Sequence, residues 1–220
     1  QHAPVPRGMT VAEAVDIGRA PHIGALRRPT RADRAVARAA LARVGASALR
    51  DRTLATLSGG ELQRVRVAVA LAQEAPCVIL DEPTSSLDLG ASARIGRLLR
   101  DLADDGLAVL VVLQDLALAA AIADVVAVMH DGRTVATGPP SSVLTPELLA
   151  EIWQVDARLS TGGGQRGTAL HIDWLGRPPG ADPDGAPVRA ALGSPAGASS
   201  RHVAVDTTPF LPSPTPDTRP

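Results

Sequence analysis

Apolar residues recur at helical spacing along much of the chain. RADRAVARAALARVG, at residues 31–45, repeats them every three to four positions, which predicts a helix that Gly45 ends. A second helix is predicted over residues 59–74, because Ser58 is suited to be its N-cap and Glu61 completes a capping box. Further helices are expected over residues 9–19, 89–105, 115–122 and 145–153.

Short apolar runs alternate with these helices from residue 77 onward. CVIL at residues 77–80 and the runs at 107–113 and 124–129 predict strands, and a hairpin turn into a further strand is expected at residues 131–137. This alternation of strands and helices predicts an α/β fold with parallel strands.

Residues 107–129 are long and apolar enough to suggest a membrane span. Gln114, Asp115 and Asp124 interrupt the run, and charges at membrane depth are costly. Strand, helix and strand in succession are therefore the preferred interpretation.

Composition narrows the classes of function. Every basic residue is arginine, and aromatic residues make up 1% of the chain, too few for stacking on single-stranded nucleic acid. The single cysteine, Cys77, lies in an apolar run and is predicted to be buried and inert. Residues 156–220, rich in Pro, Gly, Ala and Ser from residue 176 onward, are predicted to form a tail without a stable core of its own, either disordered or loosely docked.

Charge is unevenly distributed. Residues 1–56 contain ten arginines and four acidic residues, whereas residues 57–150 contain six arginines and twelve acidic residues. The basic segment is suited to a partner's acidic loops or to membrane headgroups, although a solvated face is the simpler explanation.

Two acidic residues end the predicted strand at residues 77–80. Asp81 stands where a carboxylate can bind Mg²⁺, and Glu82, one position further, where it can polarise an attacking water. A solvated acidic turn is the alternative.

The start of the predicted helix at residue 59 offers a second element of phosphate chemistry. Ser58-Gly59-Gly60 provides free N–H groups at a helix N-terminus and room for a phosphate to approach the backbone. An ordinary capped helix explains Ser58 and Glu61, but it does not explain two glycines in succession, which weaken a helix start.

LSGGELQRV at residues 57–65, followed by a helix and CVILDEPTSSLD at residues 77–88, resembles the ATP-binding subunits of ABC transporters over residues 1 to about 155. Other segments resemble the importers of iron–siderophore, haem or cobalamin: QHAPVPRGMTVAEAVDIGRAPH and GPPSSVLTPELLAEIW. The resemblance implies a P-loop NTPase-type α/β domain, here without its first strands and phosphate loop. It divides the chain into a helical subdomain (1–56), the signature, Walker B and switch region (57–155) and the tail (156–220).

The resemblance also implies roles for individual residues. Those that bind nucleotide or metal are Asp81 of Walker B for Mg²⁺, the signature residues Ser58, Gly59, Gly60 and Gln63, Asp88 in the D-loop, and Gln1 at the Q-loop position. Glu82 matches the catalytic glutamate.

Two departures bear on activity. The phosphate-loop motif G-x-x-x-x-G-K-[ST] is absent because the chain has no lysine, and in the family it would precede Gln1. Gln114 stands where the family has its switch histidine, and glutamine cannot carry a proton charge as histidine can. The chain on its own is therefore expected to be inactive as an ATPase.

The function implied is that of the C-terminal part of an ABC importer subunit, which couples ATP binding and hydrolysis to transport. Its cofactors would be ATP and Mg²⁺. Its partners would be a second ATPase subunit in a homodimer, permease subunits and, indirectly, a substrate-binding protein, with no nucleic acid. It would be cytoplasmic, peripheral on the inner face of the cell membrane.

Two alternatives stay open. One is a degenerate ABC module that acts as a non-hydrolysing interaction partner, which the missing lysine and Gln114 favour. The other is a soluble ABC ATPase of DNA repair or translation. Against the second, the sequence has no long coiled coil between its motifs and a net charge of only −1.

Overall fold

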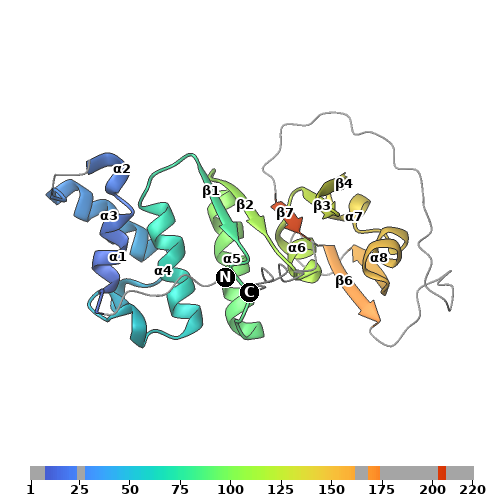
Figure 1. The fold of residues 1–220 in the computed structure, drawn as a ribbon, viewed down its shortest axis with the longest axis horizontal. Coiled ribbons are helices and arrows are strands. Elements are labelled where there is room, and N and C mark those ends of the chain that lie inside the picture. Colours follow the sequence, from blue (N-terminus) through green and yellow to red (C-terminus); the bar gives the residue numbers. More distant parts are fainter. Residues whose placement is uncertain (1–7, 24–27, 162–167, 174–202, 207–220) are drawn as a thin grey trace, which may run out of the picture.

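The computed structural model describes residues 8–23, 28–161, 168–173 and 203–206. The helices are α1 (Val11–Ile17), α2 (Ala20–Ile23), α3 (Arg31–Arg43), α4 (Gly59–Leu71), α5 (Leu89–Asp104), α6 (Leu116–Ile122), α7 (Pro140–Val143) and α8 (Pro146–Trp153). The strands are β1 (Cys77–Asp81), β2 (Ala108–Val112), β3 (Val126–His130), β4 (Arg133–Gly138), β5 (Asp156–Thr161), β6 (Thr168–Asp173) and β7 (Val203–Asp206). Figure 1 shows α1 to α4 at one end of the molecule and the strands towards the other.

Three helices of this end begin in the same way. In α1, α3 and α4 an N-cap hydroxyl accepts a hydrogen bond from the N3 amide, and the N3 carboxylate accepts one from the N-cap amide. The pairs are Thr10 and Glu13, Thr30 and Asp33, and Ser58 and Glu61. Each box satisfies amides that a helix start leaves without partners.

A buried arginine joins these helices. Arg19, 6% exposed, donates to the backbone oxygen of Ala72 at 2.8 Å and forms ion pairs with Glu74 at 2.6 Å and Asp33 at 3.3 Å. These contacts connect the end of α1 to α3 and to the end of α4. The helical segment thus has a polar tie as well as an apolar core.

A five-stranded sheet forms the other part of the molecule, in the order β1-β2-β7-β3-β4. β1 runs parallel to β2, with Asp81 opposite Val112. β3 and β4 form an antiparallel hairpin around Asp131 and Gly132, both at positive φ. The predicted α/β architecture, parallel pairing and hairpin are confirmed.

The middle strand comes from the end of the chain. β7 pairs in parallel with β3 over four residues and with β2 through Ala204 opposite Val112. Between residues 156 and 206, the sequence pattern predicted neither β7 nor the antiparallel pair β5–β6. The four-residue run VAVD is too short to stand out within a segment rich in Pro, Gly and Ala.

The prediction that Cys77 is buried is wrong. β1 alternates exposed and buried residues, so Val78 and Leu80 face the core while Cys77 is exposed and Ile79 is 69% exposed. An apolar run cannot show by itself whether one face or both faces of a strand are covered.

The apolar stretch at residues 107–129 divides into β2, α6 and β3, as predicted. Within the described ranges, none of the helices combines the length and apolar character that a membrane crossing requires.

Candidate nucleotide site

The loop after β1 lies between two cavities. The first, of about 160 Å³, lies between the start of α4 and the start of α5. The second, of about 300 Å³, is lined by residues at the ends of β1 and β2 and at the start of α5. Leu87 lines both cavities, so this loop connects them.

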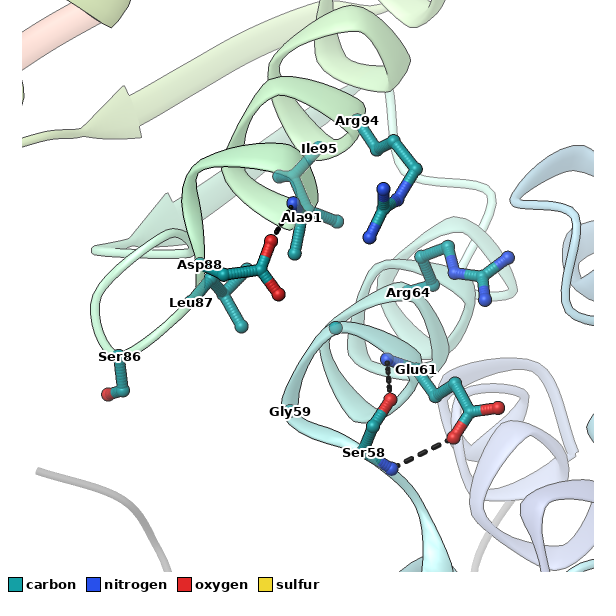
Figure 2. A pocket seen from close by; sticks show the side chains of 11 residues that line it. Ser58, Gly59, Glu61, Arg64, Ser86, Leu87, Asp88, Ala91, Arg94 and Ile95 are labelled. Atoms are coloured by element: carbon teal, nitrogen blue, oxygen red, sulfur yellow. Dashed lines mark hydrogen bonds between the residues drawn. The ribbon is translucent and has the colours of Figure 1, made fainter.

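Ser58, Gly59 and Gly60 line the first cavity, and Asp88 faces them from the start of α5 (Figure 2). The Ser58 hydroxyl accepts from the Glu61 amide at 3.3 Å, and Glu61 accepts from the Ser58 amide at 2.8 Å. The hydrogen bond from the Ser58 amide lowers the pKa of the Glu61 carboxyl. The Ser58 side chain also lowers the pKa of Glu61 by a hydrogen bond, so its hydroxyl hydrogen can donate either to this carboxylate or to an anion in the cavity.

The two glycines have a packing reason as well as a chemical one. A Cβ atom on Gly59 would lie 3.3 Å from Leu87 Cδ2, and one on Gly60 would lie 3.2 Å from the Ala91 Cβ. Both positions therefore face closely packed neighbours in the loop and in α5. The backbone amides at this helix start lie in the first turn, where no intrahelical acceptor exists.

Two arginines of the first cavity were not predicted. Arg64 lies one turn after Gly60 on α4 and donates to the Gly45 oxygen at 2.7 Å. Arg94 extends from α5 into the space between α5 and α4 (Figure 2). Helical spacing from Gly60 was a signal for Arg64, but none in the sequence indicated Arg94. Together they place two guanidinium groups, which suit phosphate, in a cavity that the carboxylates of Glu61 and Asp88 also line.

Glu82 and Gln114 meet at the second cavity. Asp81 and Val112 are opposite each other in the sheet, so the residues that follow leave adjacent strand ends. Gln114 Nε2 donates to Glu82 Oε1 at 2.5 Å. Glu82 has a φ of 44°, a strained conformation for a non-glycine residue, while its amide donates to the Val112 oxygen at 3.0 Å.

The remaining predicted site residues are more scattered. Asp81 is exposed at the end of β1 and lines neither of the two cavities. Asp88 is the N-cap of α5, accepting from the Ala91 amide at 2.7 Å. Gln63 is buried and accepts from Arg66 at 3.4 Å, so its side chain does not line the first cavity. Gln1 lies outside the described residues.

The donor set fits a magnesium ion that arrives with a nucleotide. Among the residues described, no three His, Cys, Asp or Glu side chains cluster as a metal site. Mg²⁺ is commonly held by one or two carboxylates together with substrate phosphates and water. The exposed Asp81 carboxylate at a strand end is compatible with that arrangement.

Comparisons with known proteins agree with this geometry. Residues 1–85 match the ABC transporter family. The hemin import ATP-binding protein HmuV of Nocardia farcinica is 48% identical over 147 residues, which are 66% of this chain and 50% of that protein. The cobalamin import ATP-binding protein BtuD of Halobacterium salinarum is 44% identical over 163 residues, 74% of this chain and 40% of that protein.

The fold of the chain is also similar to that of ABC transporters. A structure of a metal-chelate type ABC transporter in an inward-facing conformation aligns with a TM-score of 0.72 at 27% identity, covering 79% of this chain and 70% of that one. The chain therefore belongs to the ABC transporter family and has the fold of its ATPases. Its relatives are importer ATP-binding proteins, and it spans about half the length of the curated relatives it matches, 50% and 40% of the two named.

Proposed function

We propose that this chain is part of the ATP-binding and ATP-hydrolysing subunit of an ABC importer for a metal chelate: an iron–siderophore, haem or cobalamin. The observation that carries the proposal is the separation of the two half-sites. Ser58-Gly59-Gly60 lines one cavity and the Glu82–Gln114 pair lines another. A protein with two such halves is suited to a dimer in which each nucleotide contacts one half from each subunit.

Each half has its own task in this proposal. The first cavity takes the γ-phosphate of a nucleotide held by the other subunit, with Ser58 and the glycine amides as donors and Arg64 and Arg94 as nearby positive charge. Asp81, at the end of β1, would hold Mg²⁺ bound with a nucleotide, and the ion would supply positive charge to the phosphates. Gln63 supports the helix that carries the donors, and Asp88 holds the start of α5.

The second cavity carries the hydrolytic chemistry. The Glu82 carboxylate orients the attacking water and accepts its proton, while the Gln114 amide fixes the carboxylate through a neutral hydrogen bond. Since glutamine has no ionisation near neutral pH, this positioning persists across that range. Gln1 would sense the nucleotide at the Q-loop position.

The proposed assembly is a homodimer of complete subunits bound to transmembrane permease subunits, which in turn receive cargo from a substrate-binding protein. The subunit would lie in the cytoplasm against the inner face of the membrane. The chain of 220 residues on its own is expected neither to bind ATP tightly nor to hydrolyse it, because it has no phosphate-loop lysine.

The test uses a complete relative as the nucleotide-holding partner. The chain is mixed with the hemin import ATP-binding protein of Nocardia farcinica, and association is measured by analytical ultracentrifugation with and without ATP and Mg²⁺. We expect ATP-dependent association that Gly60→Asp abolishes, because the new carboxylate repels phosphate and crowds Ala91. The control Glu82→Gln should retain it. Association that is equally strong with and without ATP, or that persists in the Gly60→Asp variant, would contradict the proposal.

A further inference from the structure

β7 closes a gap in the middle of the five-stranded sheet. It lies between β2 and β3 and runs parallel to both of them (Figure 1). Where the structure describes the chain, β2 and β3 do not pair with each other, so without β7 the sheet would divide into the pair β1–β2 and the hairpin β3–β4. We call the space between the facing edges of β2 and β3 the β7 slot, because it has room for one parallel strand.

The two edges of the β7 slot hold β7 unequally. β3 pairs with β7 at four positions, whereas β2 pairs with it through Val112 opposite Ala204. On the side of β2 that faces β7, residues 108–111 have no partner strand within the described ranges. A strand with so few ladder hydrogen bonds on one side is released more easily than a middle strand that is fully paired on both.

β7 is also far from the rest of the sheet along the chain. The preceding strand, β6, ends at Asp173 and β7 begins at Val203, so 29 residues (174–202) separate them. A segment of this length spans at most about 100 Å when fully extended, which is enough to reach the sheet of another copy. By contrast, β4 follows β3 after the two-residue turn at 131–132 and cannot reach beyond its own β3.

The β7 slot is expected to close late in folding. α5 alone separates β1 from β2, and a tight turn joins β3 to β4, so both pairs form from segments close in the sequence. β7 instead brings Val203 opposite Val126, and contacts over such a long separation form slowly because loop closure costs entropy. Until that step, both edges of the slot are open to the β7 of any copy of the chain.

We propose that the β7 slot accepts β7 from a second copy of this chain, so that two copies exchange the strand and each completes the sheet of the other. The exchanged strand makes the same ladder with β2 and β3 as it does within one chain. The dimer and the monomer therefore differ mainly in the entropy of association and in the path of the connecting residues. By mass action, the dimer becomes populated when the protein is concentrated while it folds.

The exchange would make one half-site depend on the other copy. Ala204 pairs with Val112, which lies two residues before Gln114, and Gln114 donates to Glu82. In the exchanged dimer, the strand end that leads to Gln114 is therefore supported by the β7 of the second copy. The exchange itself needs neither cavity and no nucleotide, so it does not rest on the proposed function.

The test cross-links β3 of one copy to β7 of another. Two full-length chains, both with Cys77→Ser to remove the native thiol, carry either Ala127→Cys or Ala204→Cys, positions that lie opposite each other in the parallel pair. They are unfolded in urea, mixed, refolded together without nucleotide and oxidised. We expect an intermolecular disulfide on a non-reducing gel. Refolding at a tenfold higher protein concentration should raise the ratio of dimer to monomer about tenfold.

Two controls separate strand exchange from other association. Ala127→Cys and Thr137→Cys lie opposite each other within the hairpin β3–β4, which cannot exchange, so two chains with these substitutions should give no intermolecular disulfide above background. Ile79→Lys tests the outer edge of the sheet: Ile79 of β1 is 69% exposed, and a lysine there discourages pairing between β1 edges. The exchanged dimer should form equally well with this substitution.

The unsubstituted chain gives an independent measurement. After refolding, light scattering coupled to size-exclusion chromatography should show a dimer that persists on dilution without ATP, because its return to monomer requires both sheets to open. Equal cross-linking of the hairpin pair, a protein that stays monomeric at every refolding concentration, or loss of the dimer in Ile79→Lys would overturn the proposal. The association with the complete relative is ATP-dependent and should reverse when ATP is removed, so the two proposals fail separately.

Discussion

The helical part and the sheet part of the molecule differ in how far apart in sequence their packed elements lie. Residues 8–74 pack α1, α3 and α4 against one another with fully buried Val11, Val15 and Val65, and Arg19 ties their ends. The sheet instead takes its middle strand from residues 203–206 and leaves Ile79 of β1 69% exposed. The helices of the first part pack against elements that are close in the sequence, whereas the sheet depends on β7, a strand that is distant in the sequence.

This difference has a consequence for the two half-sites. The signature cavity joins the helical part to the start of α5, whereas Glu82 and Gln114 stand on the ends of β1 and β2. We therefore expect damage to the sheet to affect the Glu82–Gln114 pair more than the capping box at Ser58.

The largest expected effect is removal of β7. A chain that ends at residue 175 should leave β2 and β3 without the strand between them, costing about 4 kcal/mol if each ladder bond contributes roughly 1 kcal/mol. Hydrogen exchange should then speed up in β2 and β3 but not in α1 or α3. A chain that ends at residue 210 serves as control. Equal protection in the two chains would show that β7 is dispensable.

A smaller loss is expected when the helical tie is cut. Arg19→Met leaves Asp33 and Glu74 without their partner and should lower the free energy of unfolding by about 3 kcal/mol, as for other buried pairs. Arg43→Met is the matched control: its pair with Asp105 is exposed, so a loss below about 1 kcal/mol is expected. Urea denaturation measures the free energy of unfolding of both variants. Similar losses would mean that the burial of Arg19 adds nothing to the stability that its ion pairs provide.

The smallest effect concerns the capping box at the signature. The folded pKa of Glu61 lies below its ordinary value, so the unfolded state binds more protons as the medium turns acidic. The stabilisation is complete above the unfolded value of about 4.3 and is lost as pH falls through the folded pKa. Glu61→Gln should therefore reduce the fall in Tm that occurs as the pH is lowered below this value. If Tm falls with the same slope in the variant, other carboxylates cause the loss of stability in acid.

Much of the architecture could be predicted, for physical reasons that also explain the failures. The capping box at Ser58 and the hairpin at Asp131-Gly132 are local signals, and the structure confirms both. β7 could not be predicted because its four residues gain stability only from strands far away in the sequence. Exposure of Cys77 depends on what covers the outer face of β1, which the strand's own residues do not specify.

The candidate site shows the same division. Ser58, Gly59 and Gly60 were predicted together and do line one cavity. Glu82 and Gln114 were each predicted as site residues, but their direct hydrogen bond was not predicted. Their roles with nucleotide stay predictions. The position of Arg94 could not be foreseen, because it depends on how α5 packs beside α4, a tertiary contact that no motif encodes.

Leu87 is the wall that the two cavities share. A shift of the Leu87 side chain towards Ser58 would therefore narrow the first cavity and widen the second at the same time. We expect that any ligand which moves this loop at one cavity also changes the volume available at the other.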